Sequence, residues 1–163
     1  MVSVSGKSVT SRSATAVAWL HFSRPETLDH LQQGSMPKGD VMAASRIAGI
    51  QAAKRTSELI PLCHNINLTS VSVRLNLEPI NQVADGTDSG PFSQVSLQPH
   101  ALKILATVES EGKTGVEMEA LIAVQIAAAT AYDMCKAVDK HIVISNIKVI
   151  RKSGGESGDW CLE

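Results

Sequence analysis

The first candidate for chemistry is the pair of carboxylates Glu117 and Glu119, which directly precedes a long apolar stretch. Glu117 stands three residues after Thr114, which is the spacing of a capping box at a helix N-terminus, so a structural role alone accounts for it. Glu119 is not explained by such a cap. Two carboxylates beside small residues could orient a polar ring or act as an acid–base pair, and the residues alone leave this interpretation open beside the structural one.

A second candidate is the pair Asp133 and Lys136, which lie three residues apart and therefore share one face of a helix. As an exposed ion pair they would add only about 0.3–0.5 kcal/mol and would need no function. Apolar neighbours surround them, however, and a lysine that is partly desolvated has its charged form disfavoured, as in lysines that transfer protons. The residues alone leave both interpretations open.

Further polar side chains come from separate segments of the chain: Lys38 in a loop, Lys54 in a predicted helix, Lys152 near the C-terminus, and His64 directly after Cys63. Each lysine alone is most simply a solvated charge, and a lone histidine is more often structural than functional. Several cations that the fold brings together would nevertheless form a phosphate site without raising the overall charge of the protein.

The composition limits the classes to which the chain can belong. A length of 163 residues predicts a single domain over residues 1–163. Hydrophobic residues make up 44% of the chain, which excludes a disordered protein. The 15 Lys and Arg against 16 Asp and Glu exclude the basic face of a general nucleic-acid-binding protein. The most apolar run, residues 120–131, is shorter than the ~20 residues of a membrane span, so we expect no membrane partner.

The cysteines and the N-terminus indicate the compartment. The three cysteines share no CxxC spacing, which argues against a disulfide framework or a zinc ribbon, and no residue set predicts a resident metal. Residues 1–12 are polar rather than apolar, so the sequence predicts no signal peptide. We therefore expect a protein of a reducing compartment, the cytoplasm.

The chemical candidates must be positioned by regular elements, and the apolar pattern predicts these. Residues 66–77 alternate apolar and polar side chains almost without exception, as a strand with one solvated face does. The same reasoning predicts strands over 14–22, 101–110 and 141–151, and helices over 25–33, 40–59 and 116–138. The order β-α-β-β-α-β predicts an α+β, ferredoxin-like fold, an antiparallel sheet with its helices on one face.

Three segments carry further expectations. Residues 78–100 are rich in Pro, Gly, Ser and Asp, which predicts a mobile surface insertion between paired strands. Residues 152–163 are rich in Gly and predict a flexible tail. Residues 120–131 lack a polar face and must be buried on both sides, yet one sheet covers only one side. We therefore predict that another subunit covers the other side, so that the protein is a homo-oligomer.

Four segments together resemble one family, the MoaC family of cyclic pyranopterin monophosphate synthases in molybdenum cofactor biosynthesis. They are KGDVMAASRIAGIQAAKRTSELIPLCH at 38–64, GKTGVEMEAL at 112–121, YDMCKAVDK at 132–140 and KSGGESGD at 152–159. The resemblance covers nearly the whole chain apart from the insertion at 78–100. It implies a ferredoxin-like fold and a hexamer, a trimer of dimers with active sites at the dimer interfaces. It also implies a cytoplasmic enzyme, or a mitochondrial one if the chain is a truncated eukaryotic member.

The resemblance also implies a reaction and its residues. In this family a cyclised dihydro-GTP is rearranged into a pyranopterin that carries a cyclic phosphate, and pyrophosphate is released, which is phosphorus–oxygen lyase chemistry. Asp133 matches the proton acceptor and Lys136 its acid–base partner. The other matching catalytic positions are Lys38, His64, Glu117 and Glu119. The substrate-binding positions are Arg12, Lys54 and Lys152 for the triphosphate, and Cys63, His64, Glu117, Met118 and Glu119 for the remainder of the substrate.

Three further points concern this interpretation. The resemblance implies no resident cofactor, although Mg²⁺ is an alternative to the lysines and the arginine for stabilising the leaving group. Ser3 stands where the V-D-V-S motif of the family has Asp. The rival hypothesis is a ferredoxin-like nucleotide-binding regulatory module without turnover, which would use the cations but would not need Lys136 opposite Asp133.

Overall fold

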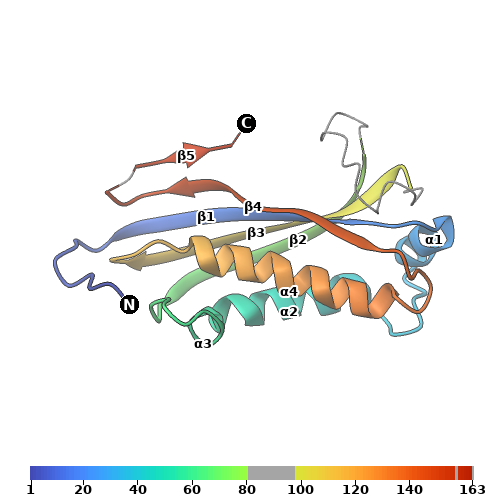
Figure 1. Ribbon diagram of the computed structural model, residues 1–163, viewed down its shortest axis with the longest axis horizontal. Coiled ribbons are helices and arrows are strands. Elements are labelled where there is room, and N and C mark those ends of the chain that lie inside the picture. The colour runs from blue at the N-terminus through green and yellow to red at the C-terminus, as the bar shows by residue number, and fades with distance from the viewer. Residues whose placement is uncertain (81–97, 157, 163) are drawn as a thin grey trace.

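The computed structural model describes residues 1–80, 98–156 and 158–162. These described residues form five strands and four helices (Figure 1). The strands are β1 (Thr10–His21), β2 (Leu68–Pro79), β3 (His100–Gly112), β4 (Val143–Ser153) and β5 (Trp160–Cys161). The helices are α1 (Pro25–Gln33), α2 (Val41–Lys54), α3 (Thr56–Leu59) and α4 (Glu117–Cys135).

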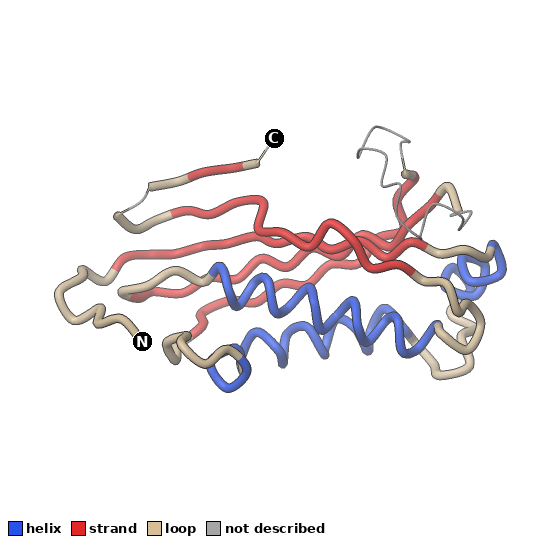
Figure 2. Tube along the Cα trace, viewed as in Figure 1, coloured by secondary structure: helices blue, strands red, loops and turns tan. Residues whose placement is uncertain are grey.

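The strands form one antiparallel sheet in the order β2-β3-β1-β4-β5. The two long helices, α2 and α4, lie side by side on one face of this sheet (Figure 2). Strand β3 pairs with both β1 and β2, so it lies between the two strands that α2 connects. This is the ferredoxin-like arrangement, and the predicted fold class is confirmed.

Many alanines lie where the helices pack on the sheet and on each other, and these small side chains allow a close approach. Alanines alternate along the helix-facing side of β1, and α4 buries the alanines at 120, 123, 127, 128 and 131. Helix α2 approaches α4 at Gly49, where a Cβ atom would come within 2.9 Å of the carbonyl oxygen of Ala123. A larger residue at position 49 would therefore push the two helices apart.

Helix α2 changes the interpretation of the apolar helix. We predicted that the sheet would cover one side of residues 120–131 and that a second subunit would cover the other. The structure shows that α2 already packs on α4 within the same chain, so most of this helix is buried without a partner. The part left uncovered is narrow and centres on Ile126, whose exposed fraction is 38%. Helix α4 is also long and apolar enough to cross a membrane, but its apolar residues form the core of the fold.

Two predicted elements differ from those observed. The helix predicted over 40–59 is interrupted at Arg55, and only the short α3 continues it. The flexible tail predicted over 152–163 is wrong for several residues, since Lys152 and Ser153 complete β4 and β5 pairs with that strand. Turn-forming glycines between β4 and β5 allow this hairpin, which apolar periodicity could not reveal.

The predicted insertion at 78–100 is shorter in the structure. Glu78 and Pro79 belong to β2 and His100 belongs to β3, and these two strands pair directly, as expected. Residues 81–97, on which the expectation of a mobile insertion falls, lie outside the described residues.

Candidate active site

We group all the predicted site residues except Lys54 into two clusters, one named for each end of α4. At the start of the helix there is a cavity of about 290 Å³. Its wall combines the first turn of α4 with the loop that follows α3 and with the turn that precedes α4. The lining residues are Leu62, Cys63, His64, Ile66, Thr114, Gly115, Glu117, Met118 and Glu119. The structure thus brings together five of the predicted substrate-binding residues in the wall of this cavity. We call these five residues, together with Lys152 and Arg12, the N-terminal cluster.

Glu119 is the most buried charged group of this cluster, with an exposed fraction of 3%. Burial raises the pKa of its carboxyl group, and repulsion by the nearby Glu117 carboxylate raises this pKa further. Burial and the proximity of Glu119 likewise raise the pKa of the Cys63 thiol. A carboxyl group with a raised pKa in a cavity wall keeps its proton to higher pH than an ordinary glutamate does, and it is therefore suited to donate a proton.

Glu117 is not part of a capping box, so that expectation is wrong. The N-cap of α4 is Val116 rather than Thr114, and Glu117 is the first residue of the helix. Val116 is almost completely buried, and this packing decides where the helix begins. The Glu117 carboxylate is consequently not engaged in a cap, and its Oε1 lies 3.3 Å from Nζ of Lys152.

His64 is held by the N-terminal segment of the chain. Its Nε2 lies 2.8 Å from the backbone carbonyl oxygen of Val2. Because a carbonyl oxygen can only accept, Nε2 carries the hydrogen, which leaves Nδ1 as the basic nitrogen of the neutral ring. Lys113 also donates to the carbonyl oxygen of Ser5, so this end of the chain is tied at two points beside the cavity. Nothing in the sequence signals a contact made by a backbone carbonyl.

Arg12 lies beneath the glycine-rich turn between β4 and β5. Its side chain is 7% exposed, and its Nε has no hydrogen-bond partner among the described residues. Gly155 approaches so closely that a Cβ atom there would overlap the Arg12 guanidinium, and its φ of 87° is in the left-handed region. Sequence reasoning did not assign Gly155 a role, although the signal was present in the adjacent glycines of KSGGESGD. Lys54 ends α2 and is exposed.

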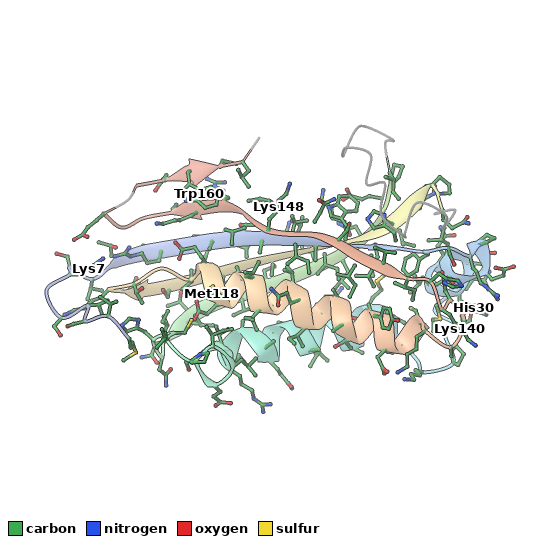
Figure 3. The ribbon with its side chains drawn as sticks, in the orientation of Figure 1. Lys7, His30, Met118, Lys140, Lys148 and Trp160 are labelled. Carbon is green, nitrogen blue, oxygen red and sulfur yellow. The ribbon has the colours of Figure 1, made fainter. Side chains whose placement is uncertain are left out.

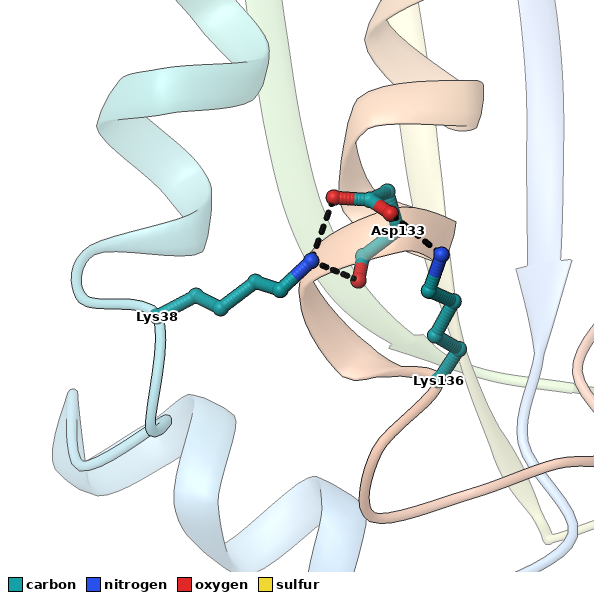
Figure 4. Close-up of polar contacts among 3 residues, drawn as sticks. All are labelled: Lys38, Asp133 and Lys136. Atoms are coloured by element: carbon teal, nitrogen blue, oxygen red, sulfur yellow. Dashed lines mark hydrogen bonds and ion pairs between the residues drawn. The ribbon is translucent and has the colours of Figure 1, made fainter.

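The second group, which we call the C-terminal cluster, consists of Lys38, Asp133 and Lys136 (Figure 4). Nζ of Lys38 lies 2.6 Å from Oδ2 of Asp133 and also donates to the Asp133 backbone carbonyl at 3.0 Å. Nζ of Lys136 lies 2.6 Å from Oδ1 of the same carboxylate. The two lysines therefore hold the carboxylate from both sides, and Lys38 reaches it from the loop before α2.

The charges of the C-terminal cluster reinforce one another. Hydrogen bonds from Lys136 and then from Lys38 lower the pKa of Asp133 to about 2. The hydrogen bond and charge of Asp133 in turn raise the pKa of Lys136. The expectation of a partly desolvated lysine with a disfavoured charge is therefore wrong, because the Lys136 side chain is 52% exposed and ion-paired. At neutral pH the cluster presents one carboxylate and two ammonium groups to solvent.

The two clusters are too far apart to act on one molecule within a single chain. Glu117 and Asp133 are 16 residues apart on one helix, which corresponds to about 24 Å along its axis. Figure 3 shows Met118 at one end of α4 and Lys140 beyond the other. Sequence reasoning grouped all six catalytic candidates together and did not detect this separation.

The described part of the chain contains no preformed metal site. No group of three or more His, Cys, Asp or Glu side chains lies close enough there to hold a metal ion. The candidate phosphate-binding groups are Lys and Arg side chains, which can bind phosphate oxygens directly.

Comparison with known proteins adds independent information. A family model described as the MoaC family matches residues 1–155. The chain is 51% identical to the cyclic pyranopterin monophosphate synthases of Chloroflexus aurantiacus and Chloroflexus aggregans over 160 residues, which is 98% of this chain and 86% of each relative. It is also 51% identical to the protein of the same name from Roseiflexus sp. (strain RS-1), of which it covers 89%.

Proposed function

The chain belongs to the MoaC family of molybdenum cofactor biosynthesis, and we propose that it converts (8S)-3′,8-cyclo-7,8-dihydroguanosine 5′-triphosphate to cyclic pyranopterin monophosphate with release of pyrophosphate. The observation that carries this proposal is the joint presence of a buried acid, a charged carboxylate–lysine cluster and separate cations at the matched positions. The relatives come from bacteria, which supports a cytoplasmic enzyme.

Binding of the substrate requires cations for its triphosphate. Lys152 contacts Glu117 at the N-terminal end of α4, Arg12 lies beneath the turn between β4 and β5, and Lys54 ends α2. The Lys152 ammonium group contacts Glu117 in this structure, so a phosphate group would compete with that carboxylate for the lysine. Glu117 would then become available to the purine-derived part of the substrate in the adjacent cavity.

The rearrangement requires proton transfers in both directions, and the two clusters offer groups of opposite tendency. The buried Glu119 retains its proton at higher pH than an ordinary glutamate and can act as a general acid. Asp133 remains ionised and can accept a proton, while Lys136 and Lys38 stabilise negative charge beside it. His64 presents Nδ1 as a further base.

One active site then has to combine the two clusters from different subunits. Glu119 and Asp133 lie equally far, seven residues, on either side of Ile126, and Ile126 is the exposed centre of α4. A two-fold axis through this position would pair two copies of α4 in antiparallel orientation. Asp133 of each subunit would then lie opposite Glu119 of its partner. We propose such a dimer as the catalytic unit, and the hexamer as three of these dimers.

The last step is proposed to be phosphorus–oxygen lyase chemistry. A sugar hydroxyl gives up its proton to a general base and attacks the innermost phosphorus, a new ester bond closes the cyclic phosphate, and the bond to pyrophosphate breaks. The cations that bind the triphosphate stabilise the charge of the departing pyrophosphate. Turnover in the presence of EDTA decides whether they suffice or whether Mg²⁺ enters with the substrate.

The proposal is tested by incubating the protein with the cyclised dihydro-GTP and measuring pyrophosphate and cyclic pyranopterin monophosphate. Stoichiometric release of both products is expected. Saturable binding of the substrate without release of either would instead establish a nucleotide-binding regulatory module. Light scattering at micromolar concentration tests the assembly, since a mass of 17.3 kDa would identify a monomer and contradict the shared site.

A further inference from the structure

A buried carboxylate outside both clusters has no role in the chemistry proposed above. Asp139 lies in the turn between α4 and β4 and has an exposed fraction of 0%. A carboxylate in such a position is costly unless its oxygens are fully hydrogen-bonded. The pattern of its hydrogen bonds therefore shows what it holds in place.

Both oxygens of Asp139 accept two hydrogen bonds. Oδ2 accepts from the backbone N–H groups of Ser23 at 2.7 Å and Arg24 at 3.1 Å. Oδ1 accepts from the hydroxyl of Ser23 at 2.6 Å and from the backbone N–H of His141 at 3.0 Å. All four donors are neutral groups. Burial opposes ionisation, but these hydrogen bonds outweigh it and lower the pKa of Asp139.

These contacts join the two segments that carry the C-terminal cluster. On one side, Lys136 precedes Asp139 by three residues at the end of α4. On the other side, Arg24 is the N-cap of α1, and the loop that follows α1 carries Lys38. Met36 anchors this loop in the core with an exposed fraction of 5%. The distance between the two lysines that hold Asp133 thus depends on how firmly the turn after α4 is fixed to the start of α1.

We propose that Asp139 is a positioning residue that holds Lys38 and Lys136 on either side of Asp133. This inference rests on the proposed function for its catalytic consequence, but its structural part can be tested without substrate. Asparagine has the same shape as aspartate but only one accepting oxygen, and its NH₂ group would face two donors. Asp139→Asn should therefore loosen the turn between α4 and β4 without leaving a cavity at position 139.

The direct test is to follow the Asp133 carboxyl carbon by NMR during an acid titration of the full-length protein and of Asp139→Asn. In the parent protein the midpoint should lie near 2. In the variant it should rise towards the ordinary value of about 3.9, because one or both lysines move away. Turnover should fall by about 10²-fold, which is the order of loss that a displacement of about 1 Å can cause.

Val108→Ala is the matched control, since it destabilises the buried centre of β3 far from this turn. It should lower the melting temperature but leave the Asp133 midpoint and the turnover of the folded protein unchanged. If Asp139→Asn does not fold, Ser23→Ala removes only the hydroxyl donor, and a smaller rise of the Asp133 midpoint is expected. An unchanged midpoint in the folded Asp139→Asn protein, or in Ser23→Ala if only that variant folds, would overturn the inference. The pyrophosphate assay of the parent protein separately decides the proposed function.

Discussion

The two ends of α4 carry the same kinds of side chain in opposite environments. At the N-terminal end, Glu119 is 3% exposed, and burial raises its pKa. At the C-terminal end, the Asp133 side chain is 53% exposed, and two lysines lower its pKa to about 2. One helix therefore provides a carboxyl group that tends to keep its proton and a carboxylate that has lost it.

This difference assigns roles that the residue types alone leave open. Two carboxyl groups with pKa values shifted in opposite directions are suited to act as acid and base at one pH. The difference arises from neighbours rather than from sequence spacing, since Glu119 lies in a cavity wall and Asp133 lies between two ammonium groups. The following predictions test whether the two ends act together and whether their environments cause the difference.

The largest effect is expected at the C-terminal end. Lys136→Ala should reduce turnover by about 10²–10⁴-fold, because a group that transfers protons or stabilises the base is removed. Asp133→Asn should reduce it by a similar factor, and the double variant should be little worse than either single one, since the two groups act as a unit. Single-turnover rates of product formation measure this. Near-normal turnover of Lys136→Ala with weaker substrate binding would show that the lysine is a phosphate contact.

The second prediction tests whether the two ends meet across an interface. Lys136→Ala impairs one cluster and Glu119→Gln the other, so each variant alone should be nearly inactive. When the two are unfolded together and refolded as a mixture, random pairing should give about a quarter of the parent activity, because half of the dimers are mixed and each mixed dimer has one intact site. Refolding each variant alone is the control. Failure to regain activity in a mixture shown to contain mixed dimers would exclude a shared site.

Much of the fold could be predicted from the sequence, because apolar periodicity determines it. The alternation in β2 and the apolar residues of α4 indicated the strand, the helix and their order. Strand β5 could not be predicted, since it depends on a glycine-rich hairpin over Arg12 rather than on periodicity. The start of α4 was predicted to within one residue, but its cap was not, because the buried Val116 rather than Thr114 is the N-cap.

The sequence proposes which residues form the candidate site, and their roles stay a prediction, but their arrangement could not be predicted. The family resemblance indicated the six catalytic positions without indicating that about 24 Å of helix separates Glu117 from Asp133. The environment of Lys136 was also inferred incorrectly. Its apolar neighbours in sequence, such as Met134 and Cys135, point into the core, whereas Lys136 itself extends into solvent. A helix places adjacent residues on different faces, so neighbours in sequence do not define the surroundings of a side chain.

The third prediction concerns the cations of the N-terminal end. Gly155→Ala should lower stability by more than the about 1–2 kcal/mol that a left-handed alanine costs, because its Cβ must also displace the Arg12 guanidinium. Gly158→Ala is the matched control, since its φ of 70° is also left-handed but its Cβ would meet nothing within 4 Å. Thermal unfolding measures the stability, and KM measures triphosphate binding. Equal effects of the two substitutions on both quantities would show that the Arg12 contact is unimportant.

The smallest expected effect is a change in stability: Glu119→Gln should stabilise the protein, although it nearly abolishes turnover. A buried carboxyl group with a raised pKa stabilises the folded protein fully only below its pKa in the unfolded chain, which is about 4.3. This stabilisation is lost as the pH rises through the pKa of the group in the folded protein. Glutamine does not ionise, so the stability of the variant does not fall with pH for this reason. The variant and the parent protein should therefore unfold at the same temperature near pH 4, and the variant should become the more stable as the pH increases.

Each unit by which the folded environment raises this pKa is worth about 1.4 kcal/mol at high pH, which for a chain of this size corresponds to roughly 3–6 °C in the melting temperature. Glu117→Gln is the control, because it removes the contact with Lys152 and relieves only the smaller, repulsive cause of the raised Glu119 pKa, so its increase with pH should be much smaller. Melting curves of the three proteins from pH 4 to pH 8 measure the difference. If Glu119→Gln were no more stable than the parent protein at pH 8, the carboxylate would already be stabilised in the cavity. The contrast between the two ends of α4 would then not arise from burial.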